Sequence, residues 1–244
     1  MRLLLVVFLL PFGAIAQPAG VQTCVACHGP QGEGSASNGA PRIAGQPQAY
    51  LERQLAAYAD GRRDNQVMTP IAKPLSVEQR SELSAYYSKL RAPAAKARAS
   101  ASASARGRTL ATRGDGSLNV QGCENCHGPG GTGFGNVNPY LAGLDRRYLE
   151  TALDEWRSGS RRTDPSQQMN QIARSLGGAD IKALAEYYAS QPPPQPAMAR
   201  AQKPRTTTPS ESTRPGTATQ ERQGTGATGG EPSGSRGPGG TVAK

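Results

Sequence analysis

The residues of this chain best suited to redox or metal chemistry fall in two short motifs. All four cysteines and both histidines of the 244-residue sequence lie in Cys-x-x-Cys-His, as Cys24, Cys27 and His28, then Cys123, Cys126 and His127. Two thiols at this spacing can add to the two vinyl groups of one porphyrin, and the adjacent imidazole then faces the iron. Each motif therefore predicts a covalently bound haem c, attached through two cysteines and ligated at the iron by the histidine.

Two other uses of a Cys-x-x-Cys pair are weaker. A thioredoxin-like redox pair needs a βαβ context, and the sequence has no such pattern. A structural zinc site shared by the two motifs would use the same side chains, because cysteine and histidine are good zinc ligands. The histidine directly after the second cysteine in both copies favours haem over zinc.

The sixth iron ligand is predicted by elimination. Both histidines are used on the near side of the iron, so methionine is the remaining soft donor. Of the four methionines, Met1 leaves with a signal peptide and Met198 lies in a tail. Met68 and Met169 follow their histidines by 40 and 42 residues, so we expect one axial methionine per haem. The alternative is that both only fill gaps in an apolar core.

The chain is an internal duplication. The first motif returns 99 residues later, and other landmarks follow in the same order. Those landmarks are Pro41–Gly45 with Pro139–Gly143, Tyr50–Glu52 with Tyr148–Glu150, Arg62-Arg63 with Arg161-Arg162, and Tyr86-Tyr87 with Tyr187-Tyr188. Five landmarks in one order predict two copies of one domain.

Each copy has helical periodicity. Apolar residues recur at helical spacing from Tyr50 towards Gly61, and again from Tyr148 towards Gly159. Ser76 and Gln79 match a capping box that opens a second helix through Leu90. A corresponding helix begins near position 177, and no alternating strand pattern is present. The sequence predicts an all-α protein with two tandem haem domains.

Composition sets the expected boundaries. Hydrophobic residues make up 36% of the chain, and 30 glycines and 20 prolines favour small domains over one large core. An apolar run after Arg2 and the small residues Ala14-Ile15-Ala16 predict a signal peptide cleaved after Ala16, and therefore export to the periplasm. The expected organisation is a signal peptide (1–16), a first haem domain (17–91), a basic Ala/Ser-rich linker (92–105), a second haem domain (106–191) and a disordered tail (192–244).

The net charge of +10 is concentrated in two segments. Residues 83–114 carry seven basic side chains and no acidic one, and the tail carries seven basic against three acidic. The rest of the exported chain is close to neutral. Nucleic-acid binding is a poor interpretation, because the basic segments lack aromatic residues interleaved with their charges and the protein is exported. Attraction to an anionic membrane surface or to acidic partner proteins fits better.

Two class I cytochrome c domains in tandem, each with these landmarks, resemble cytochrome c4. The resemblance extends from Thr23 to about Ser190. It implies that the carbonyls of Pro30 and Pro129 accept the Nδ1 protons of the two motif histidines, which would fix the rings and raise their basicity. It also implies a shortened N-terminal helical segment in the first domain, whereas residues 106–118 supply one in the second.

The resemblance further implies contacts to the haem faces and edges. Ile43 and Leu141 are expected to pack on the haem faces, and Arg42 to lie near the haem propionates of the first domain. Tyr140 stands at the position of Arg42 in the second domain, where the same role is therefore not expected.

A histidine and a methionine on each iron would leave no position for a substrate, so the leading hypothesis is an electron carrier with no small-molecule substrate. By family analogy it would connect a quinol-oxidising complex to a terminal oxidase or reductase through redox protein partners. The rival is a dihaem enzyme, of thiosulfate dehydrogenase or peroxidase type, with one labile distal ligand. A third interpretation is a membrane-complex subunit held by its tail.

Overall fold

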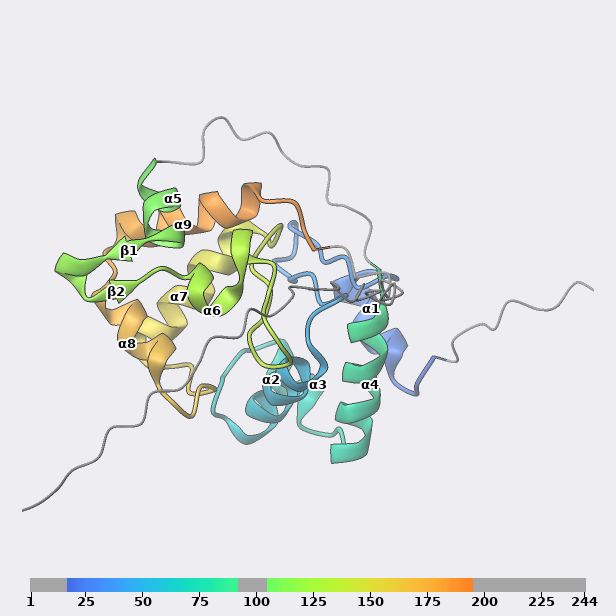
Figure 1. The fold of residues 1–244 in the computed structure, drawn as a ribbon. Coiled ribbons are helices and arrows are strands. Elements are labelled where there is room, and N and C mark those ends of the chain that lie inside the picture. The colour runs from blue at the N-terminus through green and yellow to red at the C-terminus, as the bar shows by residue number, and fades with distance from the viewer. Residues whose placement is uncertain (1–16, 92–104, 195–244) are drawn as a thin grey trace, which may run out of the picture. The chain divides into compact units, whose positions relative to one another are not determined.

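The computed structural model describes residues 17–91 and 105–194 (Figure 1), which belong to the same structural unit. They are mostly helical, with one hairpin of two-residue strands, so the predicted all-α class is confirmed. No helix within these two ranges is long and apolar enough to cross a membrane. The expected signal peptide, nearly all of the linker and the tail from residue 195 lie outside the described residues.

The first repeat is built from four helices. These are α1 (Val21–His28), α2 (Gln48–Asp60), α3 (Met68–Ala72) and α4 (Val77–Lys89). Helix α2 ends where Gly61 takes the left-handed φ of 77°, as its sequence predicted. Helix α4 begins with the expected capping box, in which the Ser76 hydroxyl accepts the Gln79 N–H and the Gln79 side chain accepts the Ser76 N–H. Both predicted helices of this repeat are therefore confirmed.

The second repeat has the same helices with additions before the motif. Its elements are α5 (Ala105–Thr112), β1 (Gly114–Asp115), η1 (Gly116–Leu118), β2 (Val120–Gln121), α6 (Glu124–His127), η2 (Pro129–Gly131), α7 (Arg146–Ser158), α8 (Gln168–Ser175) and α9 (Gly178–Ser190). Helix α7 begins where the Asp145 carboxylate accepts the N–H groups of Arg147 and Tyr148, and it ends at Gly159 with φ 78°. Helix α5 packs along α9, an arrangement without a counterpart among the described residues of the first repeat.

The hairpin corrects the prediction for residues 106–118. Helix α5 stops at Thr112, and β1 pairs antiparallel with β2, Gly114 opposite Gln121. Gly114 has φ +81°, and a Cβ there would lie 2.2 Å from the Val120 carbonyl oxygen. Strands of two residues are too short for an alternating pattern, so periodicity could not predict them.

Each repeat has its own apolar core, closed by a pair of tyrosines. Tyr86 and Tyr87 pack edge to face with ring centroids 5.2 Å apart, and Tyr187 and Tyr188 do so at 5.1 Å. The second ring of each pair presses on a glycine that follows the motif. A Cβ on Gly131 would lie 2.5 Å from the Tyr188 ring, and its φ is +75°. This glycine is therefore required by close packing as well as by its backbone.

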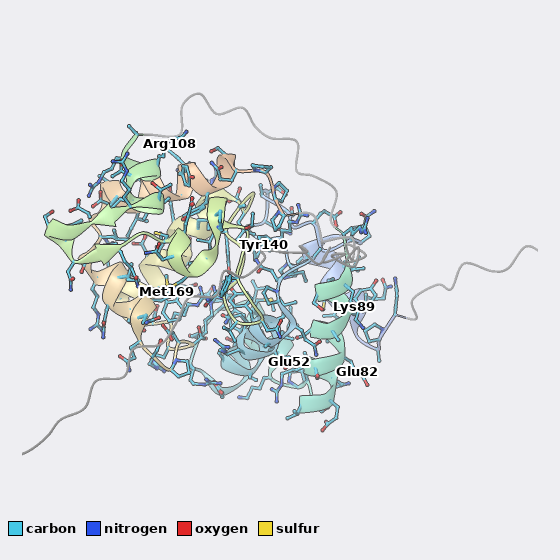
Figure 2. All side chains as sticks on the ribbon, viewed as in Figure 1. Glu52, Glu82, Lys89, Arg108, Tyr140 and Met169 are labelled. Carbon is cyan, nitrogen blue, oxygen red and sulfur yellow. The ribbon has the colours of Figure 1, made fainter. Side chains whose placement is uncertain are left out.

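The two repeats are joined by a buried contact at Tyr140 (Figure 2). Its hydroxyl donates to the Ala44 carbonyl at 2.9 Å, and its N–H donates to the Gln46 side chain at 3.2 Å. The Gln46 amide donates back to the Tyr140 carbonyl at 3.0 Å. Tyr140, which replaces Arg42 in the second repeat, thus holds the first repeat against the second.

Candidate haem centres

Each Cys-x-x-Cys-His motif lies on a short helix that ends at its histidine. In the first repeat α1 carries Cys24 and Cys27 and ends at His28, where Gly29 leaves the helix with φ 79°. In the second repeat α6 begins after Cys123 and ends at His127, before Gly128 with φ 74°. About one helical turn therefore presents two thiols and an imidazole together in each repeat.

The four thiols do not form disulfides. Burial raises the pKa of Cys123 to about 11, and it also raises the pKa of Cys24. A catalytic thiol of the thioredoxin type needs a lowered pKa, because the thiolate is the nucleophile. These cysteines therefore have the environment of attachment points rather than of a redox-active pair.

A backbone carbonyl fixes each motif histidine. The Nδ1 atom of His28 lies 2.7 Å from the Pro41 carbonyl oxygen, and that of His127 lies 2.8 Å from the Pro139 carbonyl oxygen. A carbonyl only accepts, so Nδ1 carries the proton and Nε2 keeps its lone pair for a metal. Burial lowers the pKa of both imidazoles, which favours the neutral form that binds a metal.

The expectation that the carbonyls of Pro30 and Pro129 accept these Nδ1 protons was wrong. The loop after each motif turns back, because the Gly34 N–H donates to the His28 carbonyl at 2.8 Å and the Gly133 N–H donates to the His127 carbonyl. This turn brings the later proline of each repeat to the imidazole. The Pro129 carbonyl is instead used locally, by the N–H and hydroxyl of Thr132.

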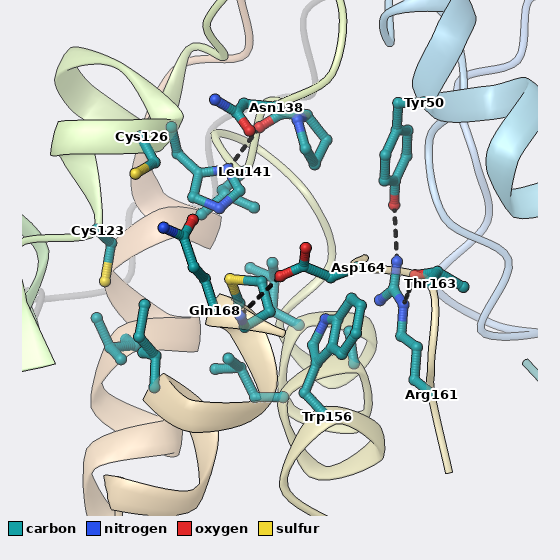
Figure 3. Close-up of a pocket in the computed structure, with 18 of the residues that line it drawn as sticks. Tyr50, Cys123, Cys126, Asn138, Leu141, Trp156, Arg161, Thr163, Asp164 and Gln168 are labelled. Atoms are coloured by element: carbon teal, nitrogen blue, oxygen red, sulfur yellow. Dashed lines mark hydrogen bonds between the residues drawn. The ribbon is translucent and has the colours of Figure 1, made fainter. Parts of the chain in front are cut away.

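Each repeat has a cavity lined by most of the predicted haem-binding residues. The second cavity, about 490 Å³, is lined by Cys123, Cys126, His127, Leu141 and Met169 among others (Figure 3). The first, about 100 Å³, is lined by Cys24, His28, Arg42, Ile43 and Met68 among others. A neutral imidazole, a thioether and an apolar side chain thus line one cavity in each repeat. Both motif thiols line the second cavity, whereas Cys24 lines the first and Cys27 does not. This donor set fits a covalently attached haem.

The backbone of each cavity methionine is held by a hydrogen bond to an Asn or Asp side chain. The Met68 N–H donates to the Asn65 side-chain oxygen at 2.9 Å, and the Met169 N–H donates to the Asp164 carboxylate at 2.9 Å. Partial burial acts to raise the pKa of Asp164, but hydrogen bonds from Met169 and Ser166 outweigh it and the pKa lies below its ordinary value. Sequence reasoning missed both residues, although an Asx residue three to five positions before each methionine is a visible signal.

Arg42 and Tyr140 occupy equivalent positions in the two repeats but make different contacts. Arg42 is buried and lines the first cavity, as its expected place near the haem propionates requires. Burial raises the pKa of Tyr140 well above its ordinary value, and the charge and hydrogen bond of Arg42 offset part of that rise. Tyr140 does not line the second cavity, because its side chain is used in the contact between the repeats.

Two further cavity residues, Arg63 and Arg161, belong to the Arg-Arg pairs that marked the duplication, but the sequence predicted no role for them. Arg63 lines the first cavity and Arg161 the second, and both are buried. The sequence aligned Arg62-Arg63 with Arg161-Arg162. The structure instead makes Arg63 equivalent to Arg161, since their N–H groups donate to the equivalent carbonyls of Ala57 and Glu155.

Comparison with known proteins agrees with this geometry. The sequence model of the cytochrome c family matches residues 17–91 and 104–192. The chain belongs to the cytochrome c family. It is 40% identical to the thiosulfate dehydrogenase electron acceptor of Thiomonas intermedia over 75% of this chain and 84% of that protein. It is 34% identical to cytochrome c4 of Thiocapsa roseopersicina over 67% of this chain and 84% of that one.

Two solved structures are similar in fold and sequence. Reduced cytochrome c4 from Pseudomonas stutzeri has a TM-score of 0.64 and 30% identity, covering 70% of this chain and 94% of that one. The thiosulfate dehydrogenase TsdBA of Marichromatium purpuratum has a TM-score of 0.64 and 40% identity over 69% of this chain. This chain spans only 36% of that longer protein.

The family and the two motifs together establish the cofactor. The chain is a dihaem cytochrome of the cytochrome c4 type, with two covalently bound haem c groups attached through the cysteines of its two motifs. Electron transfer with redox protein partners is the activity that this family supports.

Proposed function

We propose that the protein is a periplasmic electron carrier that accepts electrons from a dehydrogenase and passes them to a membrane respiratory complex. Its donor is an enzyme of the thiosulfate dehydrogenase type. Two relatives, from Thiomonas intermedia and Stutzerimonas stutzeri, are described as electron acceptors of that enzyme, and each is 40% identical to this chain. The acceptor is a terminal oxidase or reductase, on family analogy alone.

The observation that carries the proposal is the donor set at each cavity. His28 and Met68 line the first cavity, and His127 and Met169 line the second. A bound haem supplies a one-electron Fe(III)/Fe(II) couple. With an imidazole and a thioether in each repeat to hold the iron of a bound haem, no position on the iron would be left for a substrate. A thioether ligand also favours the reduced iron, which suits an electron acceptor.

Rigid placement of these ligands also supports a carrier. Backbone carbonyls hold both imidazoles at 2.7 and 2.8 Å, and side-chain oxygens hold both methionine N–H groups at 2.9 Å. Ligands held in both oxidation states keep the reorganisation on electron transfer small. Ile43 and Leu141 add apolar walls that limit water at the cavities.

A reduction assay separates this carrier from the rival dihaem enzyme. Oxidised protein is mixed anaerobically with thiosulfate alone, with a purified thiosulfate dehydrogenase alone, and with both, while haem absorbance is followed. We expect reduction only when substrate and dehydrogenase are both present. Reduction by thiosulfate alone would show that the protein is itself the enzyme, and no reduction in any mixture would remove this dehydrogenase as the donor.

Export is tested separately. Cell fractionation should find the haem protein in the periplasm with Gln17 as its first residue, as expected from cleavage after Ala16. A cytoplasmic haem protein that retains residues 1–16 would contradict this part of the proposal.

A further inference from the structure

Two buried arginines stand at the wall that the two haem cavities share. Tyr50, Gln54 and Tyr148 line both cavities. Arg63 and Arg161, with side chains 3% and 4% exposed, lie beside this wall. We call the group the arginine cluster, and its members are Arg63, Arg161, Gln54, Glu155, Tyr50 and Tyr148.

The positive charge of the cluster exceeds its negative charge. Among the described residues, Glu155 is the carboxylate within 4.0 Å of these guanidinium groups, and it serves both. One carboxylate cannot neutralise two guanidinium groups. A buried charge without a counter-charge is costly, so the cluster as it stands calls for a further anion.

The two arginines share Glu155 unequally. Arg63 holds it through two nitrogens, Nε at 3.0 Å and Nη2 at 2.9 Å. Arg161 approaches it only to 4.0 Å. The close partners of Arg161 are neutral: Gln54 at 2.8 Å, Tyr50 at 3.2 Å and Thr163 at 3.3 Å, with the Trp156 ring 4.6 Å away. The excess positive charge therefore lies on Arg161, at the second cavity.

Tyr148 responds to this charge. Its burial acts to raise its pKa, but the charges of Arg63 and Arg161 outweigh burial and lower it. The pKa of Tyr50, whose hydroxyl bonds Arg161, is instead raised by burial and by the neighbouring Tyr148. The unequal sharing of Glu155, and not the titration of either tyrosine, is what leaves Arg161 able to take a further anion.

Haem c, which the residues at these cavities fit, carries such anions. Haem c has two propionate carboxylates, and guanidinium binds a carboxylate well through its planar fork of N–H groups. We propose that Arg161 is the counter-ion of a haem carboxylate at the second cavity. Arg63 does not have this role at the first cavity, because it is paired with Glu155. Figure 3 shows Arg161 across the cavity from Cys123 and Cys126, with its bond to Tyr50 dashed.

This arrangement makes Arg161 and Glu155 determinants of the difference between the two haem potentials. Reduction adds one negative charge at a haem, and a nearby positive charge in a poorly screened interior favours it. Loss of Arg161 leaves a carboxylate unneutralised beside the second haem and lowers that potential. Loss of the Glu155 charge frees Arg63 and raises the potential of the first haem. Ala57 stands in the first repeat at the position that Glu155 occupies in the second. Duplication alone would therefore not give this asymmetry.

The test is a potentiometric titration of the purified dihaem protein and its variants. In Arg161→Gln we expect the reduction equilibrium of the second haem to shift at least tenfold towards oxidised, about 59 mV for one electron, with a smaller shift at the first. In Glu155→Gln we expect the first haem to shift towards reduced. Met169→His identifies the second titration step, because replacing a thioether by imidazole lowers the potential of that haem.

Matched variants keep the result interpretable. Arg162→Gln removes the neighbouring exposed arginine, whose side chain bonds the Gly61 carbonyl, and should leave both potentials unchanged. Arg161→Lys keeps the charge without the fork and should retain most of the second potential. If Arg161→Gln fails to fold, Glu155→Gln still decides, because its side chain is 18% exposed and the change is isosteric.

Three results would overturn the proposal. The first is a shift in the potential of the second haem that is no larger in Arg161→Gln than in Arg162→Gln. The second is a Glu155→Gln variant in which the potential of the first haem does not rise. The third would show that a free anion is the partner of Arg161. Wild-type potentials that change when sulfate replaces chloride at constant ionic strength, with no change in Arg161→Gln, would assign the site to a solution anion instead.

Discussion

In the first repeat the attachment motif follows only residues 17–23 of the described chain, whereas in the second a helix and a hairpin precede it. The first repeat places Arg42 at its cavity, and the second uses Tyr140 at that position to hold the repeats together. The histidine, its carbonyl acceptor and the capped methionine are the same in both. Duplication has therefore kept the ligand geometry and changed the support around it.

The equivalence of the two attachment sites gives the largest expected effect. Replacing Cys24 and Cys27 by serine should leave one haem c per chain, and replacing Cys123 and Cys126 should do the same. The reason is that each pair of thiols forms the covalent bonds to one haem. Haem is counted as pyridine haemochrome per protein. Loss of both haems in either variant would show that the repeats do not bind haem independently.

The additional helix of the second repeat can be tested at Gly107. A Cβ there would lie 2.2 Å from the Ala183 carbonyl oxygen of α9, so Gly107→Ala should lower stability by about 1–3 kcal/mol, as overpacking does. This loss opposes the usual gain from alanine in a helix. Denaturant unfolding followed at the haem of each repeat measures it.

Gly178→Ala is the matched control for that variant. A Cβ on Gly178, the first residue of α9, meets nothing within 4 Å. Its stability should be unchanged or slightly raised. Equal effects of the two substitutions would mean that the contact of α5 with α9 does not support the second repeat.

The start of the last helix differs between the repeats and predicts a smaller effect. Ser76 caps α4 through its hydroxyl, whereas Gly177 precedes α9 without a side chain. Ser76→Ala should therefore lower the stability of the first repeat by about 1 kcal/mol. Gly177→Ser should raise that of the second by a few tenths of a kcal/mol. Thermal unfolding of both variants checks the sign, and a loss in Gly177→Ser would contradict the comparison.

The contact between the repeats predicts an effect of similar size. Tyr140→Phe removes the hydrogen bond to the Ala44 carbonyl and keeps the ring, at a cost of about 0.5–1.5 kcal/mol. We expect the two repeats to unfold less cooperatively in this variant, as seen by separate transitions at the two haems. Unchanged coupling would mean that the Gln46 hydrogen bonds suffice.

The haem attachment and most helices could be predicted because their signals are local. Cys24, Cys27 and His28 are adjacent in sequence, and the Ser76 capping box spans four residues. The same holds for the ends of α2 and α7 at Gly61 and Gly159.

What sequence reasoning missed depends on contacts between distant segments. The acceptor of the His28 proton is Pro41, which a turn of the loop brings back over thirteen residues. The roles of Tyr140 and Arg161 exist only once the two repeats have docked. Nothing in the spacing of residues within one repeat shows how the other will pack against it.

Methionine ligation of the iron in both repeats has its own signature in the absorption spectrum of the oxidised protein. Methionine sulfur on ferric haem gives a weak far-red band, which can be quantified per haem. We predict two equivalents, one of them lost in Met68→Ala and the other in Met169→Ala, with Met198→Ala unchanged. One equivalent or none in the wild-type protein would contradict methionine ligation in both repeats, and would indicate an iron with an open position.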